Sequence, residues 1–236
     1  MVKRHMRFLI SAVLAFGFVF ALASGLQAEW RSGDSFSQAV PESGATALNG
    51  AVYLLSGSSG TGFKRFFEAY NVVEDGWRPL TPIPVDRTQF SVAAGSGQIV
   101  VTGGRVAGTS ESTNSSWMFS SAKSYWTQIT PMPGRRYEHM SAIVGNFMYV
   151  FGGAGEETDK IYRYNLGSGE WSILPGTMPV TLSQAGITVV DNDIIIAGGM
   201  TSTGQNNVDL PNRHKIEKNA LICSDRGIDR TSHGIP

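Results

Sequence analysis

The residues of this chain that could do chemistry are four arginines in short polar segments. Arg87 and Arg136 each stand three residues after a proline, Arg135 directly precedes Arg136, and Arg105 follows a glycine pair. A guanidinium group donates hydrogen bonds through a planar fork, which suits bidentate capture of a carboxylate or an acidic sugar. The candidate ligand-binding residues are therefore Arg87, Arg105, Arg135, Arg136 and the neighbouring Glu138.

These arginines also have a structural interpretation, because an arginine after a proline can brace a neighbouring element through backbone carbonyls. His139 is expected to be a buried structural histidine. Sequence signatures of a nucleophile elbow, of a zinc protease or of a phosphate-binding loop do not occur. The four histidines are dispersed and Cys223 is the single cysteine, so we expect neither a metal nor a cofactor.

The elements that would position these residues form a repeat. Glycines at positions 57, 104, 153 and 199 each end a short apolar run, and tryptophans at 30, 77, 126 and 171 follow the same spacing. A period near 47 residues in two unrelated residue types indicates a repeat architecture. The predicted structural residues of the repeat are Gly57, Gly103, Gly104, Gly152, Gly153, Gly198, Gly199, Trp77, Trp126, Trp171, Tyr70 and Tyr164.

Each unit contains four predicted strands. In the third unit they are the alternating run 139–144, the apolar run 147–151 into Gly152-Gly153, a strand at Tyr164 and a strand at Trp171. The dipeptides Gly145-Asn146 and Asp191-Asn192 supply the tight turns between the first two strands. The glycine pair should let the chain leave the second strand with positive φ and approach a neighbour closely.

These residues resemble the kelch repeat of β-propellers over roughly residues 30 to 200. The resemblance implies an all-β, kelch-type β-propeller with about four repeats. It also implies that a splice closes the ring, in which Trp30 supplies the last strand of a blade begun by residues 187–190, 194–197 and 219–223. Three readings stay open: a small closed ring, an incomplete ring that needs a partner or forms oligomers, and a shortened gene product.

The N-terminus is a separate segment. Lys3, Arg4 and Arg7 precede the apolar run 8–23, which is the layout of a secretory signal peptide cleaved after Ala23 or Ala28. An uncleaved anchor is the alternative, although the run is shorter than a typical span. The expected domains are a signal peptide over 1–28, the propeller over 29–200, and a partial last blade with an irregular tail over 201–236. The expected location is secreted or periplasmic, with no membrane span after cleavage.

The charge composition limits the classes of partner that the chain is expected to bind. The chain has 19 basic and 19 acidic residues, and this balance argues against a nucleic-acid partner. The sequence favours an exported binding module that presents an arginine-containing face to a protein or an acidic glycan. One alternative is a periplasmic sugar mutarotase, because the chain resembles the N-acetylneuraminate epimerases, which are exported kelch propellers. The other is a truncated fragment without independent activity.

Overall fold

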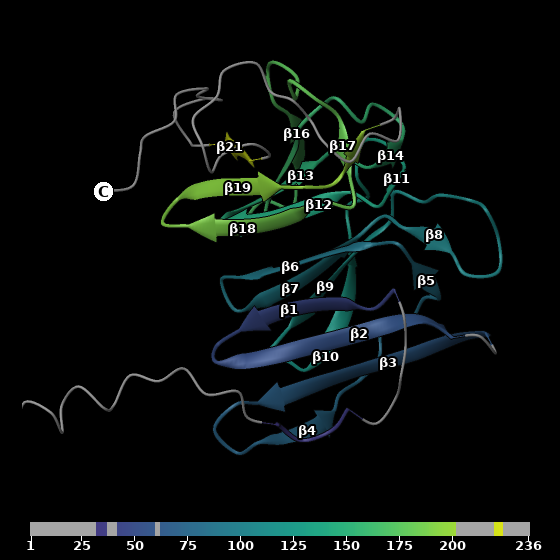
Figure 1. Ribbon diagram of the computed structural model, residues 1–236, viewed down its shortest axis with the longest axis vertical. Helices are drawn as coiled ribbons and strands as arrows, with labels where there is room; N and C mark the ends of the chain where they lie inside the picture. The colour runs from purple at the N-terminus through teal and green to yellow at the C-terminus, as the bar shows by residue number, and fades with distance from the viewer. Residues whose placement is uncertain (1–31, 37–41, 60–61, 202–219, 224–236) are drawn as a thin grey trace, which may run out of the picture. The chain divides into compact units, whose positions relative to one another are not determined.

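The structure, a computed structural model, describes residues 32–36, 42–59, 62–201 and 220–223. All regular secondary structure in this part of the chain is β-strand, which confirms the predicted all-β fold class. The strands all lie in the unit Ser35–Pro236, and the preceding unit is Met1–Asp34. They form four main sheets, which we call blades one to four (Figure 1).

The first three blades are antiparallel sheets of four strands each. Blade one contains β1 (Gly44–Leu48), β2 (Ala51–Ser59), β3 (Gly62–Asn71) and β4 (Gly76–Pro79). Blade two contains β6 (Ser91–Gly95), β7 (Gln98–Thr102), β9 (Ser116–Ser120) and β10 (Tyr125–Ile129). Blade three contains β12 (Met140–Val144), β13 (Phe147–Phe151), β15 (Tyr162–Asn165) and β16 (Trp171–Ile173).

Blade four has three strands in the described part of the chain: β18 (Gly186–Val190), β19 (Asp193–Ala197) and β21 (Ala220–Cys223). The pairing of β21 with β19 confirms the predicted third strand of this blade. Trp30, proposed for its outer strand, lies outside the described residues. The inner strands β1, β6, β12 and β18 lie against one another in this order, and the ring is not closed (Figure 1).

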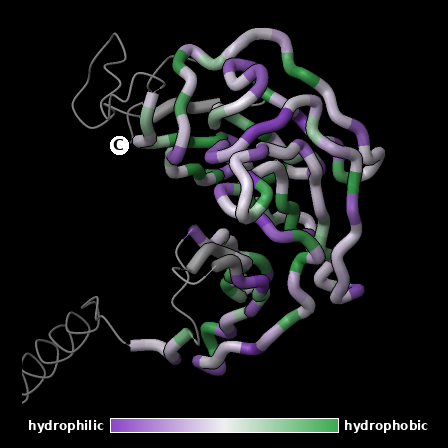
Figure 2. Tube along the Cα trace, turned by 90° about the vertical axis from the view of Figure 1, so that its right-hand side faces the viewer, coloured by the Kyte–Doolittle hydropathy of each residue, from purple (hydrophilic) through white to green (hydrophobic). Residues whose placement is uncertain are grey.

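Tight turns set the register of each inner hairpin. Val144 pairs with Phe147 and Val190 pairs with Asp193, so both predicted dipeptides form two-residue turns. Hydrophobic residues recur along the tube of the described chain (Figure 2). The inner strands β12 and β13 are mostly apolar and almost entirely buried. Because successive side chains point to opposite faces, such strands give a sheet apolar side chains on both faces for packing against its neighbours.

Three apolar clusters fill the junctions between consecutive blades. The first joins blades one and two around Leu55, Phe67 and Phe119. The second joins blades two and three around Val100 and Tyr164, and the third joins blades three and four around Phe151 and Ile196. Each cluster also contains one buried residue of the linker that connects its two blades: Ile83, Met132 and Met178, respectively.

Short ladders at one end of the blades connect the linkers to the loops that follow the second strands. They are β5 (Arg87–Thr88) with β8 (Arg105–Val106), β11 (Arg136–Tyr137) with β14 (Ala154–Gly155), and β17 (Leu182–Ser183) with β20 (Met200–Thr201). We call this end of the blades the loop face. The ladders hold the linkers and the loops after the second strands together at the loop face.

The glycine pairs make the close approach that the sequence predicts. A side chain at Gly103, where φ is 58°, would place its Cβ 2.4 Å from the Arg136 carbonyl oxygen. At Gly152 the corresponding distance to the Leu182 oxygen is 2.1 Å. The next glycine of each pair donates its N–H to the same carbonyl: Gly104 to Arg136 at 2.8 Å and Gly153 to Leu182 at 2.7 Å. These two pairs thus fasten one blade to the next, whereas at Gly198 no atom lies within 4 Å of the Cβ position and the predicted close approach is not made.

Blade one departs from this expectation. Its second strand continues through Gly57 to Ser59, with a register shift between Leu55 and Gly57. The position that corresponds to Gly103 is Ser56, whose side chain is fully buried. A serine Cβ cannot make the approach that a glycine makes here, and the chain forms a bulge and a longer hairpin instead.

Substitution of Gly152 by alanine should destabilise the protein by about 2–3 kcal/mol, because the methyl group would meet a backbone oxygen in a left-handed conformation. Gly145→Ala is the matched control: φ is 56° there, as against 59° at Gly152, but nothing lies within 4 Å of its Cβ position. The control should lose about 1 kcal/mol. Urea unfolding measures both, and equal losses would contradict the role of the close approach.

Candidate interaction site

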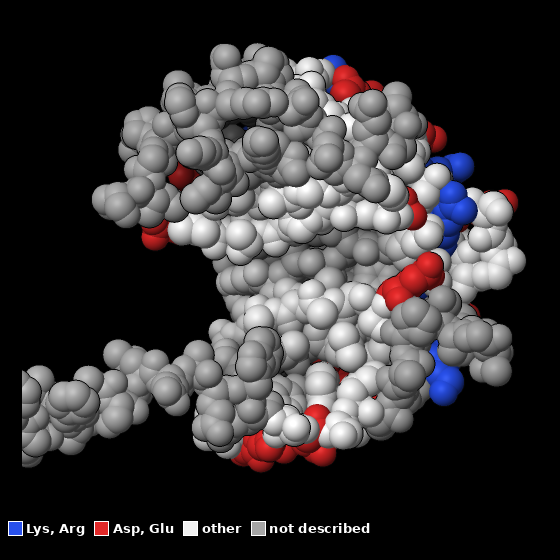
Figure 3. All heavy atoms as spheres, in the orientation of Figure 1, with Lys and Arg blue, Asp and Glu red and all other residues white. Residues whose placement is uncertain are grey.

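The loop face gathers charged residues of both signs. Figure 3 shows basic and acidic side chains along this end of the blades, over β5, β8, β11 and β14. The ladders bring Arg105 close to the linker of blade two and to the segment 135–138 of blade three. The five candidate residues therefore lie in one region, but their side chains have different surroundings.

Arg87 is buried, with 4% of its surface exposed. Its Nη1 donates to the Gly103 and Ser115 carbonyl oxygens, at 2.9 Å each, and its Nη2 donates to the Ser115 hydroxyl. Burial lowers the pKa of Arg87 from 12.5 to about 10. Because its fork is occupied by the loop after β7, this geometry supports bracing rather than ligand capture.

Arg136 occupies the equivalent position in blade three and is fully buried. Its guanidinium donates to the carbonyl oxygens of Gly152, Glu156, Glu157 and Lys160. The carbon at its centre lies 3.8 Å from the centre of the Tyr162 ring. Burial lowers the pKa of Arg136, while Tyr162 and the nearby acidic residues oppose this change. As at Arg87, the fork braces a loop and is not presented to a ligand.

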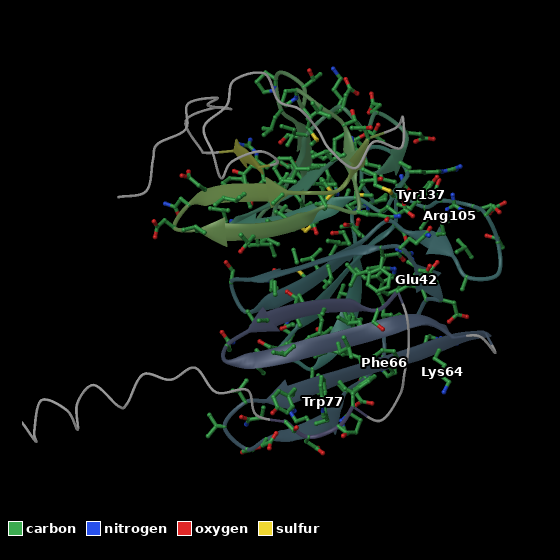
Figure 4. The ribbon with its side chains drawn as sticks, in the orientation of Figure 1. Glu42, Lys64, Phe66, Trp77, Arg105 and Tyr137 are labelled. Carbon is green, nitrogen blue, oxygen red and sulfur yellow. The ribbon has the colours of Figure 1, made fainter. Side chains whose placement is uncertain are left out.

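Arg105 has a different environment. It is half-buried in β8, and its guanidinium carbon lies 4.0 Å from the centre of the Tyr137 ring in β11. This cation–π contact crosses from blade two to blade three, and both residues lie side by side in Figure 4. The Nε of Arg105 is buried and makes no hydrogen bond. Among the candidate arginines, Arg105 thus rests on an aromatic ring and has one donor, at its buried Nε, without a hydrogen-bond partner in the described residues.

Arg135 and Glu138 flank this contact. Arg135 is exposed, and its backbone N–H donates a hydrogen bond to the Glu156 carboxylate at 2.9 Å. This bond does not involve the guanidinium group of Arg135. Glu138 is half-buried, and its backbone N–H donates to the Gln89 carbonyl at 2.8 Å. Both side chains therefore belong to the loop face next to Arg105 and Tyr137.

Sequence reasoning missed a row of acidic and amide side chains at one repeat position. Glu42, Gln89, Glu138 and Gln184 each stand two residues before an inner strand, and their φ angles are 59°, 54°, 55° and 55°. Glutamate and glutamine rarely adopt this left-handed conformation, which costs about 1 kcal/mol or more at each site. Four repetitions of the strain suggest that these residues are retained for their side chains.

We call these four residues the left-handed row. The Glu138 N–H bonds to the Gln89 carbonyl, and the Gln184 N–H bonds to the Glu138 carbonyl at 3.0 Å, so the row crosses two blade junctions. The Oε1 atom of Gln89 is buried without a hydrogen-bond partner. Equal spacing before the inner strands was the only sequence signal that could have identified the row.

His139 is buried next to this region and accepts or donates a 2.9 Å hydrogen bond with Thr102. Burial, assisted by the Arg136 charge, lowers the pKa of His139 from 6.5 to about 3. The folded protein therefore holds a neutral imidazole, as expected for a structural histidine. Groups of three or more His, Cys, Asp or Glu residues placed to hold a metal do not occur in the described residues. The described segments contain no helix long and apolar enough to span a membrane.

The lowered pKa predicts a pH dependence. Since the unfolded chain binds a proton near pH 6.5 and the folded chain only near pH 3, the contribution of His139 is complete above about pH 6.5 and decreases as the pH falls toward 3. At pH 5 the loss should be about 2 kcal/mol. Urea unfolding of wild type and His139→Gln at pH 7.5 and 5 measures it. An equal pH dependence in both proteins would contradict the prediction.

The bracing role can be tested at adjacent arginines. Arg136→Lys should destabilise the protein by about 2–3 kcal/mol, because an ammonium group cannot reach carbonyls on several sides as the planar fork does. Arg135→Lys, at the exposed neighbouring position, should change the stability by less than about 0.5 kcal/mol. Thermal and urea unfolding compare the two. A small loss in both would show that the fork does not hold the loop.

Comparison with known proteins agrees with this architecture. Residues 89–214 match the family model described as the KLHDC2/KLHL20/DRC7 Kelch-repeats domain. The chain is 30% identical to Kelch-like protein 40 of Xenopus tropicalis over 146 residues, which are 60% of this chain and 24% of that protein. It is 26% identical to Kelch-like protein 35 of Mus musculus over 159 residues, 67% of this chain and 27% of that protein.

A fungal relative, Kelch-like protein terF of Aspergillus terreus, is 25% identical over 145 residues, 58% of this chain and 31% of that protein. The matched segment thus spans about a quarter to a third of the length of these relatives. The family model matches more than half of the chain, over blades two to four, and the matched range includes Arg136, the glycine pairs of these blades and the ladders β11 with β14 and β17 with β20. The chain belongs to the kelch-repeat family.

Proposed function

We propose that this chain is an interaction module whose loop face binds an extended, acidic segment of a partner protein. Kelch repeats typically serve as protein-interaction modules, and the chain carries such repeats. The observation that supports the location is Arg105, because its half-buried guanidinium rests on Tyr137 and keeps an unused donor. Arg87 and Arg136 are not part of the proposed contact, since backbone carbonyls occupy them.

The unused groups suggest what the ligand supplies. Arg105 lacks an acceptor at Nε, and Gln89, one residue beyond its ladder partner Thr88, lacks a donor at Oε1. Buried polar groups are nearly always paired in proteins, so two such atoms, one in β8 and one directly after β5, favour a ligand that reaches and completes both. An acidic side chain next to a backbone N–H has this chemistry. The left-handed row adds further acceptors for the amides of an extended segment.

The same proposal includes export. The basic start at Lys3, Arg4 and Arg7, followed by the apolar run 8–23, supports a signal peptide that directs the chain to a secreted or periplasmic location. An acidic glycan is the alternative ligand, because a guanidinium fork binds a sugar carboxylate in the same way. Measurement of both ligand types on the mature protein distinguishes the two.

The binding test uses a fluorescein-labelled octapeptide rich in Asp and Glu, together with its Asn and Gln counterpart. Wild type should bind the acidic peptide, and Arg105→Ala should weaken this binding at least about tenfold, because a desolvated charge contact is lost. Fluorescence anisotropy gives the affinities. Isothermal titration calorimetry with N-acetylneuraminate reports the glycan alternative, which would be favoured if the sugar binds and the peptides do not.

Arg163→Ala is the matched control, since Arg163 also lies over an aromatic ring, 4.8 Å from the centre of Phe147, but in β15 of blade three. This variant should bind the acidic peptide as wild type does. If Arg105→Ala keeps full affinity while its melting temperature is unchanged, the proposed contact is wrong. Equal binding of the acidic and amide peptides would also contradict it.

A further inference from the structure

We propose that Asn49, in the turn between β1 and β2 of blade one, is a site of spontaneous deamidation, and that its isoaspartyl product loosens this blade. Asn49 precedes Gly50, and both residues are exposed. Leu48 pairs with Ala51, so these two residues form the whole turn. Figure 1 shows the turn at the end of blade one opposite to the loop face.

The reaction uses only groups of the turn and water. The Gly50 backbone nitrogen attacks the Asn49 side-chain carbon Cγ, a succinimide ring closes, and the amide nitrogen leaves as ammonia with the hydrogen of the Gly50 N–H. Water then opens the ring. Addition of water at Cγ gives aspartate, and addition at the main-chain carbonyl carbon gives isoaspartate, in which the chain continues through the side chain. Because the chain joins the attacking and attacked atoms, the first step is unimolecular.

The structure leaves both reacting groups unprotected. In the described residues the Asn49 side chain makes no hydrogen bond, and the Gly50 N–H donates none. Apart from the chain neighbours, no described atom lies within 4 Å of the Cβ position of Gly50, so its nitrogen is not shielded. The φ angles are 51° at Asn49 and 77° at Gly50, which both residue types tolerate. Exposed turns open locally at low cost, which lets the side chain reach the nitrogen.

The other asparagines in the described part of the chain lack one or more of these conditions. Side-chain hydrogen bonds hold Asn71, Asn114, Asn146 and Asn165. Asn192 is exposed, but it precedes Asp193, whose side chain hinders attack by its own backbone nitrogen. None of these five asparagines precedes a glycine. The structure therefore singles out Asn49.

The two products differ in their effect on blade one. Aspartate forms the same turn, since Asp-Gly suits two left-handed residues as Asn-Gly does. Isoaspartate adds a backbone carbon to a turn whose two residues close the register between Leu48 and Ala51. Gly44 of β1 packs so closely on Phe90 that a Cβ atom there would lie 2.4 Å from the ring, so β1 has no room to shift toward blade two. Isoaspartate should therefore disturb the register of the hairpin.

The test follows the masses of two tryptic peptides. Full-length protein is incubated for weeks in mildly alkaline buffer and digested. Asn49 is the single asparagine of peptide 32–64, and Asn146 is the single asparagine of peptide 137–160. Peptide 32–64 should gain about 1 Da in a fraction of molecules at least about tenfold larger than peptide 137–160, with fragmentation spectra placing isoaspartate at position 49. No gain in peptide 32–64, or equal gains in both peptides, would overturn the site.

Asn49→Ser is the matched control, because Ser96-Gly97 forms the equivalent turn of blade two with φ angles of 51° and 74°. This variant should melt as wild type does and gain no mass on incubation. The isoaspartyl fraction of aged wild type, isolated by ion exchange, should melt at least about 2 °C below fresh protein, whereas Asn49→Asp should melt within about 1 °C of it. An isoaspartyl fraction that melts as fresh protein does would overturn the loosening of blade one.

Discussion

The structure depends on the approach of a glycine pair to a carbonyl of the next blade. At the junctions formed by Gly103 and Gly152, the approach leaves no room for a Cβ atom, and the following glycine donates a hydrogen bond to the same carbonyl. Apolar packing stabilises the stacked sheets but is non-directional. The glycine contact is geometrically specific, because it fixes where the linker to the next blade must pass and therefore where the inner strand of that blade begins.

The bracing arginines depend on this contact. Once the linker is fixed, Arg87 and Arg136 point back into the loops after the second strands and hold carbonyls that would otherwise stay unpaired in the interior. Buried carbonyls without donors are costly, so the loops are rigid only while the forks are in place. Arg105 and Tyr137 are then presented by braced ladders rather than by free loops, which is the condition for a preorganised contact.

The repeat could be predicted from the sequence because its signals are local and periodic. The apolar runs, the glycine pairs and the turns at Gly145 and Asp191 all occur where spacing placed them. The spacing of the arginines in the sequence could not distinguish the role of Arg105 from that of Arg136, because each role depends on which backbone carbonyls lie within reach of the guanidinium after folding. It also did not reveal the bulge at Ser56 or the left-handed row, because serine, glutamate and glutamine carry no strong local preference for these conformations.

The proposed interaction site lies at a central position in the array of blades. In a stack of repeats each unit is stabilised by its own sheet and by its neighbours. Arg105 and Tyr137 bridge blades two and three, each of which packs against a blade on both sides. Local opening is easiest where the fewest apolar contacts must break. The central site, with apolar clusters on both sides of its blades, is therefore suited to rigid recognition.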